Sequence, residues 1–201
     1  MYTMIGSPRN RGGRVMWMLE EIGEDYEVVD VFPHTDKIKE HNPSGKVPAL
    51  LDDGEVIIDS TAILLHLADK HNKLTFPLGS IERARMYSMI NFALDDFEGP
   101  LWTMAKHTFV LPEKVRVKEA ITPAAMHEYS RAMKTLEARL GDNTFAVGDQ
   151  FSVADIIIGH CGGWAKNSGF PMPEGKVGDY ITRIRSRDGW KAVLQRQKKQ
   201  G

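Results

Sequence analysis

The chain has 201 residues, of which 42% are hydrophobic and 26% charged, and its formal net charge is −1. This balance is typical of globular proteins, and the length suits one large domain or two small ones. The charge gives no support to a nucleic-acid partner, since such proteins usually carry a basic patch. Cys161 is the only cysteine, which excludes an intrachain disulfide and a thiolate zinc site.

The sequence lacks the signals of export and membrane insertion. Its N-terminus does not follow the basic-then-apolar plan of a signal peptide, and no apolar run approaches the roughly 18 residues of a membrane-spanning helix. We therefore expect a cytoplasmic protein without a membrane partner. The histidines show no metal-ligand spacing, so we expect no metal.

The first elements follow a strand, helix, strand order. A short β-like run at Tyr2–Ile5 breaks at Gly6-Ser7-Pro8, and a β-rich run follows later at Tyr26–Phe32. Between them, apolar residues recur at the spacing of one helix face, at Val15, Met18, Leu19 and Ile22. This order predicts two parallel strands joined by a right-handed crossover.

A hairpin and a second helix are predicted next. The apolar runs "VPALL" and "EVIID" are separated by Asp52-Asp53-Gly54, and Asp-Gly between such runs indicates a hairpin. A helical period then begins at Ser60. Residues 1–76 thus predict a β-α-β-β-β-α unit with a mixed sheet, which is the plan of a thioredoxin-like domain.

The rest of the chain predicts helices only. Residues 77–83, which contain Pro77 and Gly79, are expected to form a linker to an all-helical domain over residues 84–201. Two apolar stripes have helical spacing, one from Met86 to Leu101 and one from Met126 to Leu140. Ser152 is the expected N-cap of a later helix, with Asp155 in the capping-box position, a structural role.

Four segments carry a resemblance to a known family. They are "SPRNRGGRVMWMLEE", "NPSGKVPALLDDG", "IIDSTAILLHLADKH" and "FAVGDQFSVADI", in this order along the chain. Together they resemble the cytosolic glutathione transferases, of a bacterial type with a serine- or theta-like N-terminal loop. The resemblance implies a homodimeric glutathione transferase that takes glutathione as its co-substrate and conjugates it to a small apolar electrophile.

Two other functions remain open at this point. The first is glutathione-dependent reduction of disulfides or peroxides, which would need a second glutathione because no cysteine lies near residue 10. The second is a non-catalytic, transferase-like binding module. His107, His160 and Trp164 are candidates for the lining of an electrophile pocket.

The loop after the first strand is the predicted site for the glutathione sulfur. Its thiolate is the nucleophile, and the N-terminus of the first helix, expected near Arg11 or Gly12, favours an anion. The candidate side chains for the sulfur are Asn10, then Ser7, then Arg11, and the Asn10 amide can donate a hydrogen bond without acting as a base. The alternative is that Ser7 and Asn10 only form the turn.

The resemblance implies that three further segments hold the rest of glutathione. Val47 and Pro48, whose peptide bond is cis in the family, would pair with the cysteinyl backbone like an added strand. Lys46 would reach the glycyl carboxylate, and Asp59 and Ser60 would bind the γ-glutamyl end. The structural alternatives are a plain strand entry, a solvated lysine and a helix N-cap.

Overall fold

A computed structural model describes residues 1–199, which form two compact units. One unit contains Met1–Thr75 together with residues 185–199, and the other contains Phe76–Ile184. All residues after the linker, 84–201, were predicted to belong to the helical domain. In the structure, the C-terminal helix packs with the N-terminal part of the chain instead.

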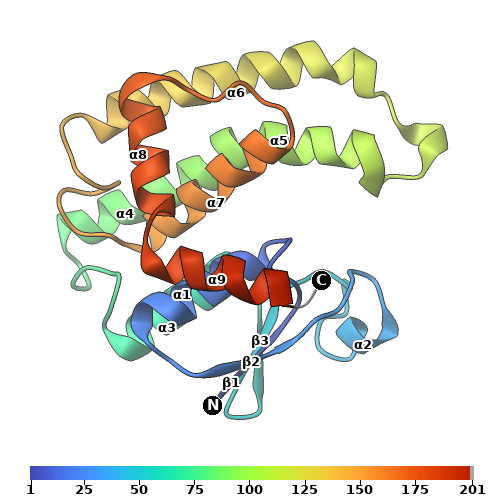
Figure 1. Ribbon diagram of the computed structural model, residues 1–201, viewed down its shortest axis with the longest axis vertical. Coiled ribbons are helices and arrows are strands. Elements are labelled where there is room, and N and C mark those ends of the chain that lie inside the picture. The colour runs from blue at the N-terminus through green and yellow to red at the C-terminus, as the bar shows by residue number, and fades with distance from the viewer. Residues whose placement is uncertain (200–201) are drawn as a thin grey trace. The chain divides into compact units, whose positions relative to one another are not determined.

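The first unit is built on a four-stranded mixed sheet of order β2-β1-β3-β4 (Figure 1). β1 pairs in parallel with β2 and antiparallel with β3, which pairs antiparallel with β4. This arrangement confirms the predicted thioredoxin-like fold. Its elements are β1 (Tyr2–Ile5), α1 (Gly12–Ile22), β2 (Tyr26–Val29), α2 (Asp36–Lys39), β3 (Ala49–Asp52), β4 (Glu55–Ile58), α3 (Ser60–His71) and α9 (Asp188–Lys199).

The hairpin between β3 and β4 turns where the sequence predicted. Asp53 and Gly54 both have positive φ, at 52° and 89°. A two-residue hairpin loop of this kind needs positive φ at both positions, which Asp and Gly tolerate. The sequence analysis did not predict α2, because four residues with only Ile38 buried show no helical period.

Helix α1 is the centre of the first unit's core. Both α3 and α9 pack on it, and Figure 1 shows α9 lying beside α1. As a result even Arg14 and Trp17 of α1 are fully buried, although the apolar period predicted only a single buried stripe.

The second unit is helical, as predicted. The residues of both predicted stripes are mostly buried, including Met86, Ile90 and Phe97 in the first and Tyr129 and Leu136 in the second. Its elements are α4 (Ile81–Phe92), the π-helical η1 (Ala93–Phe97), α5 (Glu98–Ala105), the π-helical η2 (Lys106–Val110), the 3₁₀-helical η3 (Glu113–Val115), α6 (Lys118–Leu140), α7 (Val153–Asn167) and α8 (Gly175–Arg185).

Asp155 has the structural role that its spacing predicted. It forms a capping box with Ser152 at the start of α7. Its carboxylate also accepts hydrogen bonds from the Ala146 N–H at 2.8 Å and from the Tyr180 hydroxyl at 2.6 Å. Burial raises the pKa of Asp155, and these donors oppose the rise. The network fastens the loop before α7 to α8.

Candidate functional site

The sheet register brings three separate loops to one edge. Ile5 of β1 lies opposite Ala49 of β3, which lies opposite Ile58 of β4. The chain therefore leaves β1, enters β3 and leaves β4 on the same rung of the sheet. We call the residues just beyond this rung, 6–12, 46–48 and 59–60, the loop edge. All of the site residues predicted for glutathione belong to it.

Two glycines let the first loop fold tightly against α1. A Cβ on Gly12 would lie 2.7 Å from the carbonyl oxygen of Ser7, and a Cβ on Gly13 would lie 2.8 Å from that of Pro8. Side-chain carbon atoms do not approach backbone oxygens this closely, so glycine is required at both positions. Because neither Gly12 nor Gly13 has a Cβ, the loop can lie next to the first turn of α1. The helix begins at Gly12, as predicted.

The side chains of Asn10 and Ser7 both shape this loop. Asn10 Oδ1 accepts a hydrogen bond from the Gly12 N–H at 2.8 Å, and Ser7 Oγ accepts one from the Arg9 N–H at 3.3 Å. Asn10 thus satisfies one of the N–H groups at the start of α1 that have no partner within the helix. The amide oxygen is an acceptor only, so a hydrogen bond donated by Asn10 to a ligand would come from its NH₂ group.

The loop edge carries more cationic than anionic side chains. Arg11, the N-cap residue of α1, is half-buried, whereas Arg9 and Lys46 are exposed. Asp59 is the only carboxylate among the loop-edge residues. This excess of positive charge, together with the N-terminus of α1, suits an anionic ligand.

The second loop presents a backbone segment that the protein itself does not pair. The Val47-Pro48 peptide is cis, as in the family that the sequence resembles. The Asn42 amide donates to the Lys46 carbonyl at 2.8 Å and fixes the loop from behind. Within residues 1–199, the backbone N–H and C=O of Val47 have no hydrogen-bond partner. A Cβ on Gly6 would lie 3.5 Å from Pro48 Cα, so the first two loops touch.

The third loop places a buried cation under the start of α3. Helix α3 begins at Ser60, with Asp59 as its N-cap at φ 66°. Ser60 is buried, and its Oγ accepts a hydrogen bond from Arg14 Nη1 at 3.5 Å. A carboxylate at this helix N-terminus would meet N–H groups and the field of a guanidinium group. The sequence analysis missed Arg14, although a charged residue among the apolar positions of α1 was a visible signal.

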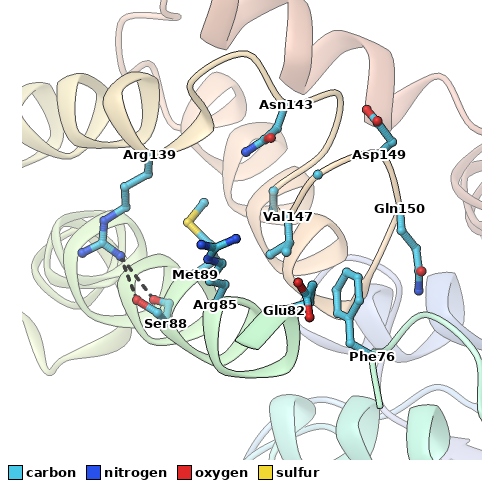
Figure 2. Close-up of a pocket in the computed structure, with 12 residues that line it drawn as sticks. Phe76, Glu82, Arg85, Ser88, Met89, Arg139, Asn143, Val147, Asp149 and Gln150 are labelled. Atoms are coloured by element: carbon cyan, nitrogen blue, oxygen red, sulfur yellow. Dashed lines mark hydrogen bonds between the residues drawn. The ribbon is translucent and has the colours of Figure 1, made fainter. Parts of the chain in front are cut away.

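The larger of the two cavities that we describe lies in the helical unit, and none of the predicted site residues lines it. It has a volume of about 780 Å³ and lies between α4, the end of α6 and the loop before α7. Figure 2 shows Arg139 reaching toward Ser88, with its Nη1 3.3 Å from the Ser88 carbonyl oxygen. Because its charged side chains include both signs and none is a predicted site residue, we assign the functional site from hydrogen-bonding groups rather than from cavity size.

The pocket-lining candidates of the helical unit make different contacts. Trp164 on α7 packs edge-on against Trp102 of α5, with ring centroids 6.3 Å apart, and His160 precedes it by one helical turn. His107 instead accepts a hydrogen bond from the Val117 N–H at 3.2 Å and so holds a loop. Trp102 and Trp164 form the aromatic pair of this group.

Neither a membrane span nor a metal cluster occurs in the described part of the chain. None of the helices within residues 1–199 combines the length and hydrophobicity needed to cross a bilayer. In the same residues, no group of three His, Cys, Asp or Glu side chains is arranged to hold a metal ion.

Comparisons with known proteins identify the family of the chain. A model of the glutathione S-transferase N-terminal domain matches residues 12–70, and a model of the C-terminal domain matches residues 119–196. A zeta-class glutathione S-transferase of Euphorbia esula is 33% identical over 72% of this chain and 67% of its own. Glutathione transferase GST 23 of Zea mays is 30% identical over 75% of this chain, which spans 66% of the maize protein.

Solved structures show the same fold over nearly the whole chain. The structure of a sphingomonad glutathione S-transferase complexed with glutathione has a TM-score of 0.82 and 30% identity, covering 97% of this chain and 98% of its own. A glutathione transferase from Methylococcus capsulatus has a TM-score of 0.83 and 27% identity, covering 98% of both chains. With both domain models matched and the fold shared from end to end, the chain belongs to the family of cytosolic glutathione transferases.

Proposed function

We propose that this protein binds glutathione at the loop edge, holds its sulfur as a thiolate and conjugates it to an apolar electrophile. The observation that carries the proposal is the Val47 backbone, whose N–H and C=O are unpaired beside the cis Val47-Pro48 peptide. The cysteinyl residue of glutathione has the complementary C=O and N–H, and it would add to this edge as a short antiparallel strand.

The charged groups at the two ends of glutathione would each lie near a protein group of opposite charge. Its γ-glutamyl carboxylate would bind at the N-terminus of α3, where the Ser60 hydroxyl and the buried Arg14 supply donors and positive charge. Asp59 would accept from the γ-glutamyl amine, and Lys46 would pair with the glycyl carboxylate. The comparison structure with bound glutathione, at 30% identity over almost the entire chain, supports this choice of ligand.

The sulfur would then lie at the start of α1. A free thiol has a pKa of about 8.5, so only a few per cent is ionised at pH 7. The helix N-terminus, the Asn10 NH₂ group and the Arg11 cation all favour the thiolate over the thiol. Each unit by which they lower the pKa of the thiol raises the thiolate fraction about tenfold until ionisation is nearly complete. The enzyme would thereby supply a ready nucleophile, and no base is needed at the site.

The test is to add glutathione to the purified protein and record the ultraviolet band of the thiolate as the pH is varied. We expect the band to titrate with a pKa well below that of the free thiol. We also expect turnover with an aryl halide, at a rate that saturates as the glutathione concentration rises. The absence of both the band and retention on immobilised glutathione would contradict the proposal. Ser60→Ala should weaken glutathione binding about tenfold, while Ser130→Ala, at an exposed serine of α6, serves as the control.

The reductase alternative lacks a thiol at the loop edge. Cys161, the only cysteine, is fully buried on α7 in the helical unit. Reduction of a disulfide would therefore proceed through two glutathione molecules, and parallel assays with a disulfide and an aryl halide separate the two activities. We further propose that the protein is a cytoplasmic homodimer, as the family resemblance implies, and light scattering on the purified chain measures its oligomeric state.

A further inference from the structure

The segment between α5 and α6 exposes several large apolar side chains. Phe109 is 66% exposed, Val110 42%, Val115 48% and Val117 50%. We call residues 106–118 the apolar tip, which Figure 1 shows in yellow-green where the chain passes from α5 to α6. Single exposed apolar residues are ordinary, but four in one short segment mark a surface that contacts something apolar.

The apolar tip is also strongly basic. It contains four cationic residues and one carboxylate, Glu113, so its net charge is +3, while the whole chain has a formal net charge of −1. The cationic residues are Lys106, Lys114, Arg116 and Lys118. Cations interspersed with exposed apolar side chains are the composition of segments that bind at anionic lipid surfaces.

Internal hydrogen bonds hold the apolar tip in shape while its apolar side chains remain outside. Arg116 donates from Nε to the Leu111 carbonyl at 2.7 Å and from Nη2 to the Phe109 carbonyl at 3.1 Å. The Val117 N–H donates to His107 Nδ1 at 3.2 Å. Backbone polar groups that are paired inside the segment do not oppose its transfer from water to an apolar environment.

We propose that the apolar tip docks the protein on an anionic phospholipid surface. Phe109 and the exposed valines would enter the boundary between headgroups and acyl chains, while Lys114 and Lys118 would contact the lipid phosphates. The expectation of no membrane partner came from the lack of a long apolar run, and peripheral docking requires none.

Co-sedimentation of the purified full chain with vesicles tests the proposal. Vesicles that contain phosphatidylglycerol should bind at least about tenfold more protein than pure phosphatidylcholine vesicles, and added salt should reduce the binding. Phe109→Ser should reduce it about tenfold by removing apolar insertion, and so should the double variant Lys114→Glu/Lys118→Glu by reversing charge. The matched controls are Ile81→Ser, at a side chain 64% exposed elsewhere in the unit, and Lys134→Glu.

Each other outcome overturns the proposal. No sedimentation with anionic vesicles would do so, as would binding that the tip variants leave unchanged. Capture by polyglutamate but not by vesicles would assign the tip to an acidic protein instead. A dimer that Phe109→Ser dissociates would make the tip a contact between copies of this chain. Because the substituted side chains are exposed, melting temperatures of all variants should match the parent, and the charge reversal tests docking independently of Phe109.

Discussion

Asn10 illustrates how one side chain serves both the fold and the proposed chemistry. Its oxygen caps α1 through the Gly12 N–H, and its NH₂ group is the donor proposed for the sulfur. Asn10→Asp keeps the capping oxygen but replaces the donor by a negative charge. We predict that this variant retains the parent melting temperature. The added negative charge should raise the pKa of the thiol of bound glutathione, and turnover should fall at least tenfold.

Asn10→Ala is the companion variant, because it removes the cap and the donor together. It should lose about 1 kcal/mol of stability in addition to activity. Thermal melts and thiolate titrations of both variants separate the two roles. Full turnover in Asn10→Asp would remove the amide from the mechanism and leave the sulfur to Ser7, Arg11 or the backbone.

Asp52 makes stability depend on pH. Burial by itself would raise the pKa of this carboxyl group, but hydrogen bonds from Lys70 at 2.6 Å and His66 at 2.7 Å outweigh burial and hold the pKa below its ordinary value of 3.8. The unfolded chain therefore takes up this proton first as the pH falls. The contribution of Asp52 is complete above the unfolded value and is lost as the pH falls through the folded pKa.

Asp52→Asn should flatten this acid dependence. Urea unfolding between about pH 7 and about pH 3 should show a smaller loss of stability for the variant than for the parent, with the variant about 1–3 kcal/mol less stable at neutral pH. Asp30→Asn, at an exposed carboxylate just after β2, is the control. Equal acid slopes for the parent and Asp52→Asn would show that the ion pair with Lys70 does not control the transition.

Some features of the candidate site could be predicted from the sequence, and others could not. The cis Val47-Pro48 peptide was expected from the family resemblance, and the structure contains it. Arg14 was missed, since its position beneath Ser60 depends on how α1 packs against α3. The close approach of Gly12 to Ser7 is likewise a property of the folded loop that spacing alone does not show.

Among the elements, α9 has the least expected role. Trp190 is buried, its ring lies 5.0 Å from that of Trp17 on α1, and Arg187 pairs with Glu21 at 2.7 Å. Trp190→Ala should therefore destabilise the unit by about 3 kcal/mol. Leu194→Ala, on the same helix but 38% exposed, should cost far less. Equal melting temperatures for the two variants would mean that α9 does not stabilise the first unit.

Local sequence patterns were sufficient to predict features that involve residues close together in the chain. The β3–β4 hairpin and the capping box of α7 were predicted because each depends on residues a few positions apart. The packing of α9 on α1 joins opposite ends of the chain, and nothing in its helical period indicates which surface it covers.

The molecule as a whole was predictable in plan, as a mixed sheet unit followed by helices, because the strand signals stop where the helical stripes begin. The proposed site depends on the register of β1, β3 and β4, because this register brings three loops to one edge of the sheet. In our proposal, this edge receives the glutathione backbone at Val47.

Amide chemical shifts during a titration of the isotope-labelled protein with glutathione test this claim most directly. We expect the Val47 amide signal to shift and to saturate together with that of Ser60, while the amide signal of Val56 on the outer strand β4 does not shift. Saturable binding of glutathione that leaves the Val47 signal unmoved, or no binding at all, would contradict it.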